Sequence, residues 1–132
     1  MTPTPNAEQT ETNKKVAVEA YDAMLNKHDI DAATKHFGTR YIQHNPMAPD
    51  GIEGFKPFFK AYISQNPNSS VEIKRVLADG DFVVLHVHLR LHPDDRGRAA
   101  VEIFRLEDGK IVEHWDVIQP IPESPANNNT MF

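Results

Sequence analysis

The segment GKIVEHWDVIQ, residues 109–119, has the pattern of a strand but carries titratable side chains among apolar ones. Alternate residues of a strand share a face, so His114 and Asp116 are expected to point the same way. A carboxylate on a half-buried strand is costly unless it is paired or reaches water. Asp116 therefore predicts one of two things: a salt bridge, to Arg105 or to a histidine, or a carboxylate that binds a ligand or transfers protons.

Two neighbouring segments offer further polar groups to the same region. Glu102 lies on the strand expected before residue 109, and a hairpin between the two strands would bring it near the row of His114 and Asp116, in a register that the sequence leaves open. The segment YIQHNP adds Tyr41 and Gln43 at alternate positions, followed by His44. We expect these side chains to contact a bound molecule.

Two histidines, His86 and His88, alternate on the strand expected at residues 82–92, opposite an apolar face. Alternate histidines can converge on one metal ion, with a third ligand from His114, Asp116 or His44. A solvated sheet face or a subunit interface is the commoner role for such a pair. We therefore expect no metal.

Three helices are expected in the first half of the chain. Apolar residues recur at helical spacing from Thr12 to about Lys27, and a short second helix follows, with Asp29 or Asp31 as its N-cap and Gly38 as its stop. After a Pro-rich and mostly irregular stretch at residues 39–51, a third helix begins near Phe55 or Lys56, with Pro57 in its first turn. Its aromatic face comprises Phe55, Phe58, Phe59 and Tyr62.

The second half alternates strands with turns. Four strands are expected at residues 70–78, 82–92, 98–107 and 110–120, and two of the connections contain Asp-Gly, which tight hairpin turns favour. Helices followed by an antiparallel meander predict an α+β fold with the helices on one face of the sheet. A strongly curved sheet would close on the helices as a cone, with a pocket at its open end.

Composition limits the classes of function. The net charge is -5, from 14 basic against 19 acidic residues, which disfavours nucleic acid and anionic membrane surfaces as partners. The absence of cysteine excludes a disulfide, a thiolate nucleophile and a Cys-based zinc site. Neither a secretory signal nor an apolar run of about 18 residues is found, so we expect a cytoplasmic protein without a membrane anchor.

The chain is expected to hold one domain, at residues 12–122, between a flexible tail at residues 1–11 and a C-terminal tail at residues 123–132. The last segment, NNNTMF, leaves two possibilities. Met131 and Phe132 fold back to fill an apolar groove, or the end is frayed, as chain termini usually are.

Residues 12–120 resemble the SnoaL-like polyketide cyclases of the nuclear transport factor 2-like superfamily. The resemblance rests on YIQHNP followed by DGIEGFKPFF, on GDFVVLHVHL, and most of all on VEIFRLEDGKIVEHWDVIQPIP. It implies a cone-shaped α+β barrel, a homodimer formed by the outer faces of the sheets, a small-molecule substrate, and neither a metal nor an organic cofactor.

The resemblance also implies a chemistry, the closure of a polyketide ring by intramolecular aldol condensation. Asp116 matches the carboxylate that acts as the general acid/base in the family, with His114 as its partner. Such chemistry needs a base in an apolar surround and donors aimed at the enolate oxygen. The residues that we expect to bind the substrate are Tyr41, Gln43, His44, His86, His88, Glu102, Phe55 and Phe59.

One residue departs from the family pattern. Glu102 stands where the cyclases favour a histidine that faces the pocket. Two carboxylates in one cavity compete for charge, and the pKa of one of them rises. That arrangement would suit dehydration, isomerisation or epoxide opening as well, and a non-catalytic small-molecule-binding or dimerisation module of the same fold is the alternative from another class.

Overall fold

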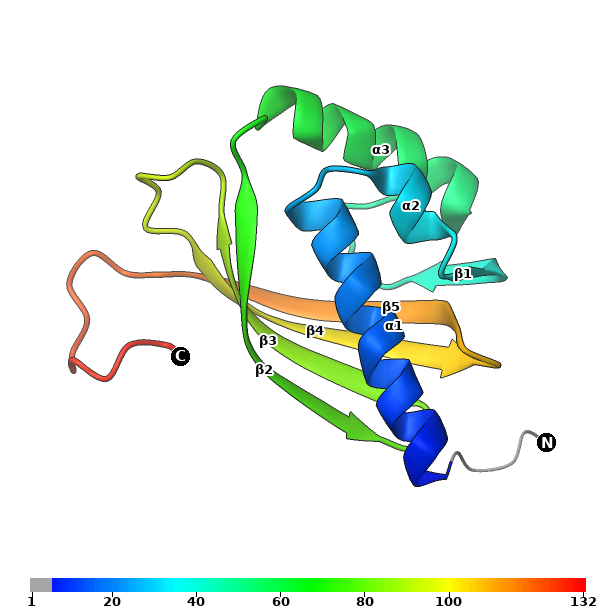
Figure 1. The fold of residues 1–132 in the computed structure, drawn as a ribbon. Helices are drawn as coiled ribbons and strands as arrows, with labels where there is room; N and C mark the ends of the chain where they lie inside the picture. The colour runs from blue at the N-terminus through cyan, green and yellow to red at the C-terminus, as the bar shows by residue number, and fades with distance from the viewer. Residues whose placement is uncertain (1–5) are drawn as a thin grey trace.

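The computed structural model describes residues 6–132, so residues 1–5 of the tail predicted at residues 1–11 lie outside the described part. Within residues 6–132 the chain forms three helices and five strands (Figure 1). Their bounds are α1 Ala7–Leu25, α2 Ile30–Thr34, β1 Phe37–Gln43, α3 Gly51–Gln65, β2 Ser70–Asp79, β3 Phe82–Arg90, β4 Arg98–Glu107 and β5 Lys110–Pro120. Helices packed on a sheet confirm the predicted α+β class.

The first helix begins at Ala7, earlier than the predicted Thr12. The reason is a capping box: the Asn6 side chain accepts the backbone N–H of Gln9, and the Gln9 side chain accepts the backbone N–H of Asn6, each at 2.9 Å. Residues 7–11 are thus helical and not part of a tail. In the described part of the chain, no helix is long and apolar enough to cross a membrane.

The two shorter helices differ in how well the sequence predicted them. Asp29 caps α2 as expected, accepting the backbone N–H of Ala32 at 3.0 Å. The third helix starts at Gly51, before the predicted Phe55, so Pro57 lies in its interior and not in its first turn. Asp50 precedes this helix, and its carboxylate accepts the backbone N–H of Gln43 at 2.9 Å, which ties the end of β1 to the start of α3.

The predicted meander is present. Strands β2, β3, β4 and β5 pair antiparallel with their chain neighbours. The turn between β4 and β5 is Asp108–Gly109, with φ of 50° and 74°, the conformation for which Asp-Gly is favoured in a tight hairpin.

A fifth strand corrects the predicted sheet. Residues within the stretch expected to be irregular form β1, which pairs parallel with β5, so the order is β1-β5-β4-β3-β2 and the sheet is mixed, not antiparallel throughout. The sheet is curved and does not close into the expected barrel (Figure 1). The pairing with β5 places Gln43 beside His114.

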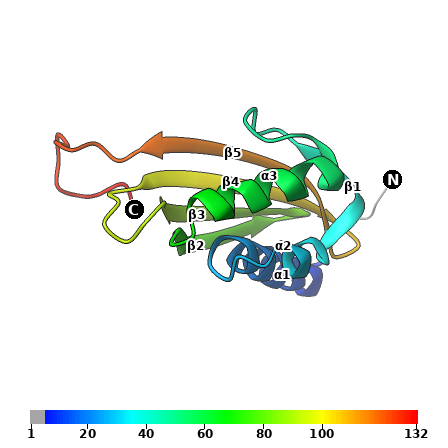
Figure 2. The same ribbon diagram turned by 90° about the horizontal axis from the view of Figure 1, so that it is seen from above.

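The helices cover one face of this sheet. Figure 2 shows α1, α2 and α3 on the same side of β2–β5. The buried side of α1, which includes Ala17, Tyr21 and Met24, faces the inward side chains of β3 and β4, among them Leu85 and Phe104. That packed layer leaves a hollow toward α3 and β5.

Candidate active site

A cavity of about 360 Å³ lies between the helices and the inner face of the sheet. Two of the predicted substrate-binding aromatic residues, Phe55 and Phe59, line it together with Tyr62 from the same face of α3. The full lining is Tyr21, Met24, Leu25, Tyr41, Gln43, Asn45, Met47, Ala48, Phe55, Phe58, Phe59, Tyr62, Leu89, Arg98, Glu102, His114, Asp116 and Ile118. Apolar walls around a few polar groups are typical of small-molecule sites.

The pairing of β4 with β5 sets the polar groups of this cavity. Glu102 lies directly opposite Asp116, as the hairpin suggested. His114 lies two residues before Asp116 on the same face of β5. The Nε2 of His114 lies 2.7 Å from the Oε1 of Glu102 but 3.9 Å from the Oδ2 of Asp116. The direct partner of His114 is therefore Glu102 and not the expected Asp116.

Gln43 fixes the proton on the other ring nitrogen of His114. Its Oε1 accepts the backbone N–H of Asn45 at 3.0 Å and lies 2.7 Å from the Nδ1 of His114, while its Nε2 donates to the Tyr41 hydroxyl at 2.9 Å. An amide oxygen only accepts, so the Nδ1 of His114 must carry a proton. The 2.7 Å contact between His114 Nε2 and Glu102 then holds one shared proton.

Asp116 is held by a different residue. The Nδ2 of Asn45 donates to both carboxylate oxygens of Asp116, at 2.9 and 3.1 Å. The side chain of Asp116 is 8% exposed, and Arg105, the cation considered for it, pairs instead with Glu113 at 2.9 Å. Asp116 is thus a nearly buried carboxylate oriented by an amide and not neutralised by a cation.

Burial changes the proton affinity of Glu102. Glu102 is almost fully buried, and this burial raises its pKa above the ordinary value, partly opposed by the hydrogen bond with His114 and reinforced by the neighbouring charge of Asp116. Glu102 thus binds a proton more readily than an exposed glutamate. A carboxyl group with a raised pKa can act as a general acid.

Two tyrosines supply neutral donors. Tyr21 and Tyr41 both line the cavity and are buried. Burial, reinforced by the charge of Glu102, raises the pKa of Tyr21, and the same two causes raise the pKa of Tyr41. Both hydroxyls stay protonated at physiological pH and can donate to a developing oxyanion.

The two carboxylates and the imidazole of the cavity are side chains of the types that bind metal ions. Ligand atoms of Glu102, His114 and Asp116 lie within 4.8 Å of one another. A metal ion bound there would have to replace the contact between His114 and Glu102 at 2.7 Å. The other metal arrangement considered from the sequence does not form, because His86 and His88 lie across the sheet from His114.

Three of the predicted binding residues are not brought to the cavity. His44 lies outside it, where its ring stacks on Trp115 with 4.8 Å between ring centroids and its Nε2 lies 2.7 Å from Glu113. The reason is the alternation of the chain at the end of β1: Tyr41, Gln43 and Asn45 face inward, and His44 faces outward.

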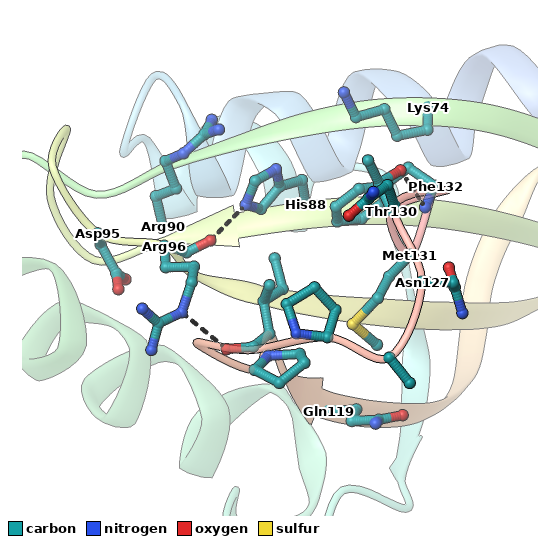
Figure 3. Close-up of a pocket in the computed structure, with 15 residues that line it drawn as sticks. Lys74, His88, Arg90, Asp95, Arg96, Gln119, Asn127, Thr130, Met131 and Phe132 are labelled. Atoms are coloured by element: carbon teal, nitrogen blue, oxygen red, sulfur yellow. Dashed lines mark hydrogen bonds between the residues drawn. The ribbon is translucent and has the colours of Figure 1, made fainter.

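His88 also faces outward, toward the C-terminal tail (Figure 3), and the ring of His86 lies 5.5 Å from that of Phe132 in the same tail, between ring centroids. His86 contacts Arg75, and the Nε2 of His88 hydrogen-bonds the backbone carbonyl of Arg96 at 2.9 Å. The Phe132 ring stacks on His88 with 4.6 Å between centroids, so the tail folds back on the sheet instead of fraying. The histidines face outward because β3 turns its apolar residues to the core.

Sequence reasoning missed three polar residues that line the cavity, Tyr21, Asn45 and Arg98. Asn45 carried a usable signal, since it continues the alternation of Tyr41 and Gln43. Tyr21 looked like an ordinary core residue of an amphipathic helix. Arg98 stood at the uncertain start of a strand, where the inward face was not defined.

The chain resembles known proteins in sequence and in structure. A family model described as SnoaL-like polyketide cyclase matches residues 15–122. No curated protein matches the chain significantly.

Solved structures share the fold at low sequence identity. A SnoaL-like protein of unknown function from Burkholderia thailandensis superposes with a TM-score of 0.73 at 21% identity, over 88% of this chain and 98% of that one. A suggested ketosteroid isomerase from Kribbella flavida superposes with a TM-score of 0.72 at 18% identity, over 92% of this chain and 87% of that one. AclR, a suggested hydroxylase from Streptomyces galilaeus, superposes with a TM-score of 0.69 at 22% identity, over 83% of this chain and 90% of that one.

Proposed function

The chain belongs to the SnoaL-like polyketide cyclase family, and on that premise we propose that it is a cofactor-independent acid/base enzyme acting on a small, largely apolar carbonyl compound. One observation carries the proposal. An oriented carboxylate, Asp116, and a carboxyl–imidazole pair, Glu102 and His114, lie side by side in an aromatic cavity. Proton abstraction α to a carbonyl needs these two kinds of group together.

Asp116 is the proposed general base. Its carboxylate removes a proton from the carbon next to the carbonyl, and the electron pair of that C–H bond moves to the carbonyl oxygen as an enolate. Asn45 keeps both oxygens of Asp116 in place through its two contacts, at 2.9 and 3.1 Å. Asn45 is in this account a positioning residue.

The enolate oxygen is stabilised by neutral donors. The Tyr41 hydroxyl accepts from Gln43, so its own proton is available to the cavity, and Tyr21 lies beside it. Donors fixed before the reaction are worth more in a dry site than in water. The proton shared between His114 and Glu102 is the proposed source for the oxygen that becomes an alcohol.

The enolate then has three outcomes. In the cyclase reaction its carbon attacks a second carbonyl of the same molecule, forming a C–C bond, and the resulting alkoxide takes up the proton shared by His114 and Glu102. In an isomerase the proton carried by Asp116 returns to a different carbon. In a dehydratase the enolate re-forms the carbonyl and expels the β-hydroxyl, which takes up the proton of the His114–Glu102 pair and leaves as water. We propose the aldol cyclisation first, because the family match supports it.

We also propose a homodimer and a cytoplasmic location. The outer face of the sheet exposes apolar side chains, among them Val117, which is 72% exposed, and Val101. Exposed apolar side chains gathered on one face favour protein contacts. A second copy of the chain is the partner that the family resemblance indicates.

An enolate mimic tests the proposal against passive binding. We expect 2-naphthol to bind roughly tenfold more tightly than 2-methylnaphthalene, because hydrogen bonds aimed at a developing oxyanion strengthen its binding. In Tyr41→Phe the difference between the two ligands should narrow. Equal affinities of the wild type for both ligands, measured by fluorescence titration, would favour the non-catalytic binding module.

A further inference from the structure

Arg98 opens strand β4 and faces the cavity. It alternates with Ala100 and Glu102, so the three residues share the inward face, and Arg98 is among the residues that line the cavity. A strand rises by about 3.3 Å per residue, which puts the Cα of Arg98 roughly 13 Å from the Cα of Glu102. A positive side chain thus stands at one end of the cavity and the carboxylates stand further along it.

Arg98 forms no ion pair in the described part of the chain, although its charge is near enough to Asp95 to contribute to the lowered pKa of that carboxyl group. None of the ion pairs among residues 6–132 includes Arg98. Residues 1–5, MTPTP, contain no acidic side chain. Asp95, on the preceding loop, uses its oxygens to accept the backbone N–H groups of Leu91 and Gly97, at 2.9 and 3.0 Å.

Other arginines of the sheet have partners. Arg105 pairs with Glu107 and Glu113, at 2.7 and 2.9 Å. Arg96, two residues before Arg98, donates to the backbone carbonyl of Ile121 at 3.0 Å under the tail (Figure 3). Arg98 differs from both, since it lines the cavity and its side chain has no hydrogen-bond acceptor within residues 6–132.

We propose that Arg98 binds a carboxylate of the substrate, which makes the substrate a keto acid and not a neutral ketone. The inference rests on the proposed function, since it concerns the same cavity. A guanidinium presents a planar fork that matches a carboxylate with two hydrogen bonds. Glu102 and Asp116 repel the same group, so the two ends of the cavity orient the substrate with its carbonyl at the carboxylates.

The separation along β4 also sets a length. The Cα atoms of Arg98 and Glu102 are roughly 13 Å apart along the strand, and Asp116 lies opposite Glu102, so we expect a keto acid with only a few carbons between its two groups to reach both ends less well. Chains or rings of several carbons between carboxylate and carbonyl fit better. The simple alternative is that Arg98 lays its apolar stem on the cavity and turns its charge to water.

Equilibrium binding separates the two possibilities without relying on turnover. The probes are 7-oxooctanoate, its methyl ester and the short acid 4-oxopentanoate, titrated by NMR or calorimetry. The wild type should bind 7-oxooctanoate roughly tenfold or more tightly than the ester, as expected for hydrogen bonds to a charged group. The wild type should also bind 7-oxooctanoate more tightly than it binds 4-oxopentanoate.

Variants assign the preference to Arg98. Arg98→Gln should remove it, and Arg98→Lys should retain part of it, because lysine keeps the charge without the fork. Arg40→Gln is the matched control, because it removes one positive charge from an exposed residue of β1. Equal binding of acid and ester by the wild type, or a preference that survives Arg98→Gln, would overturn the proposal.

The binding preference and the proton exchange can fail separately, so the two proposals can be told apart. If the acid preference fails while neutral ketones still exchange α-protons through Asp116, the proposed function stands without Arg98 as its specificity residue. If the acid preference depends on Arg98 but Asp116 has no effect on exchange, the cavity recognises keto acids without acting as the proposed base.

Discussion

Environment gives each titratable residue of the cavity its role. Glu102 and Asp116 are both carboxylates on paired strands, but Glu102 contacts an imidazole and Asp116 contacts an amide. Their types were visible in the sequence. Their partners were not, because Gln43 at the end of β1 and Asn45 just after it lie 71 positions before His114 and Asp116, respectively.

The raised pKa of Glu102 predicts a pH-dependent stability. Folding favours its protonated form, so this contribution is complete below the ordinary value of 4.5 and is lost as the pH rises through the raised folded value. Glutamine mimics the protonated form. The free energy of unfolding of Glu102→Gln should therefore exceed that of the wild type at neutral pH, by about 1.4 kcal/mol per unit of the pKa shift. The variant should accordingly melt at a higher temperature. The difference should shrink toward pH 4.

Glu113 on the outer face is the control for this measurement. Partial burial opposes its ionisation, but hydrogen bonds with His44 and Arg105 prevail and lower its pKa. Its contribution to stability is therefore present above the ordinary value of 4.5 and lost as the pH falls. Glu113→Gln should destabilise at neutral pH. Melting curves in which both variants shift in the same direction at every pH would contradict this electrostatic account.

At the scale of elements, strand β1 is the feature that the sequence hid. It is short, precedes Pro46 and pairs parallel with the last strand of the chain, so no local turn announced it. The meander was predictable because Asp-Gly turns fix neighbouring strands locally. The start of α3 was misplaced because Pro57 suggested a first turn, whereas the helix continues through it.

The outer face of β4 and β5 carries the proposed dimer contact. Val117→Arg adds a charge to a side chain that is already 72% exposed, so the fold of the single chain should tolerate it. Met47→Arg is the matched control, at a residue 79% exposed beside the cavity. Sedimentation should show a dimer for the wild type and Met47→Arg and a monomer for Val117→Arg. A wild type that sediments as a monomer at micromolar concentration would contradict the dimer.

For the whole molecule, the hydrophobic pattern predicted the α+β class, and the resemblance of the quoted motifs predicted the family. Strand alternation is local, so the pattern also predicted that His114 and Asp116 share a face, whereas the place of Glu102 depended on a register that the sequence left open. The apolar face of β3, opposite His86 and His88, already indicated that these histidines face outward, and the expectation that they bind the substrate did not follow that pattern. The sheet remains open because β1 joins β5 and no described strand closes the gap to β2.

The most direct test of the central claim is α-proton exchange in D₂O, followed by NMR, for a panel of ketones, β-keto esters and keto acids. The exchange should proceed in EDTA and fall by about 10² to 10⁴-fold in Asp116→Asn, as expected for loss of a positioned general base. Glu113→Gln, on the outer face of the same strand, should leave the rate unchanged. Exchange at the wild-type rate in Asp116→Asn would contradict the assignment of Asp116 as the base.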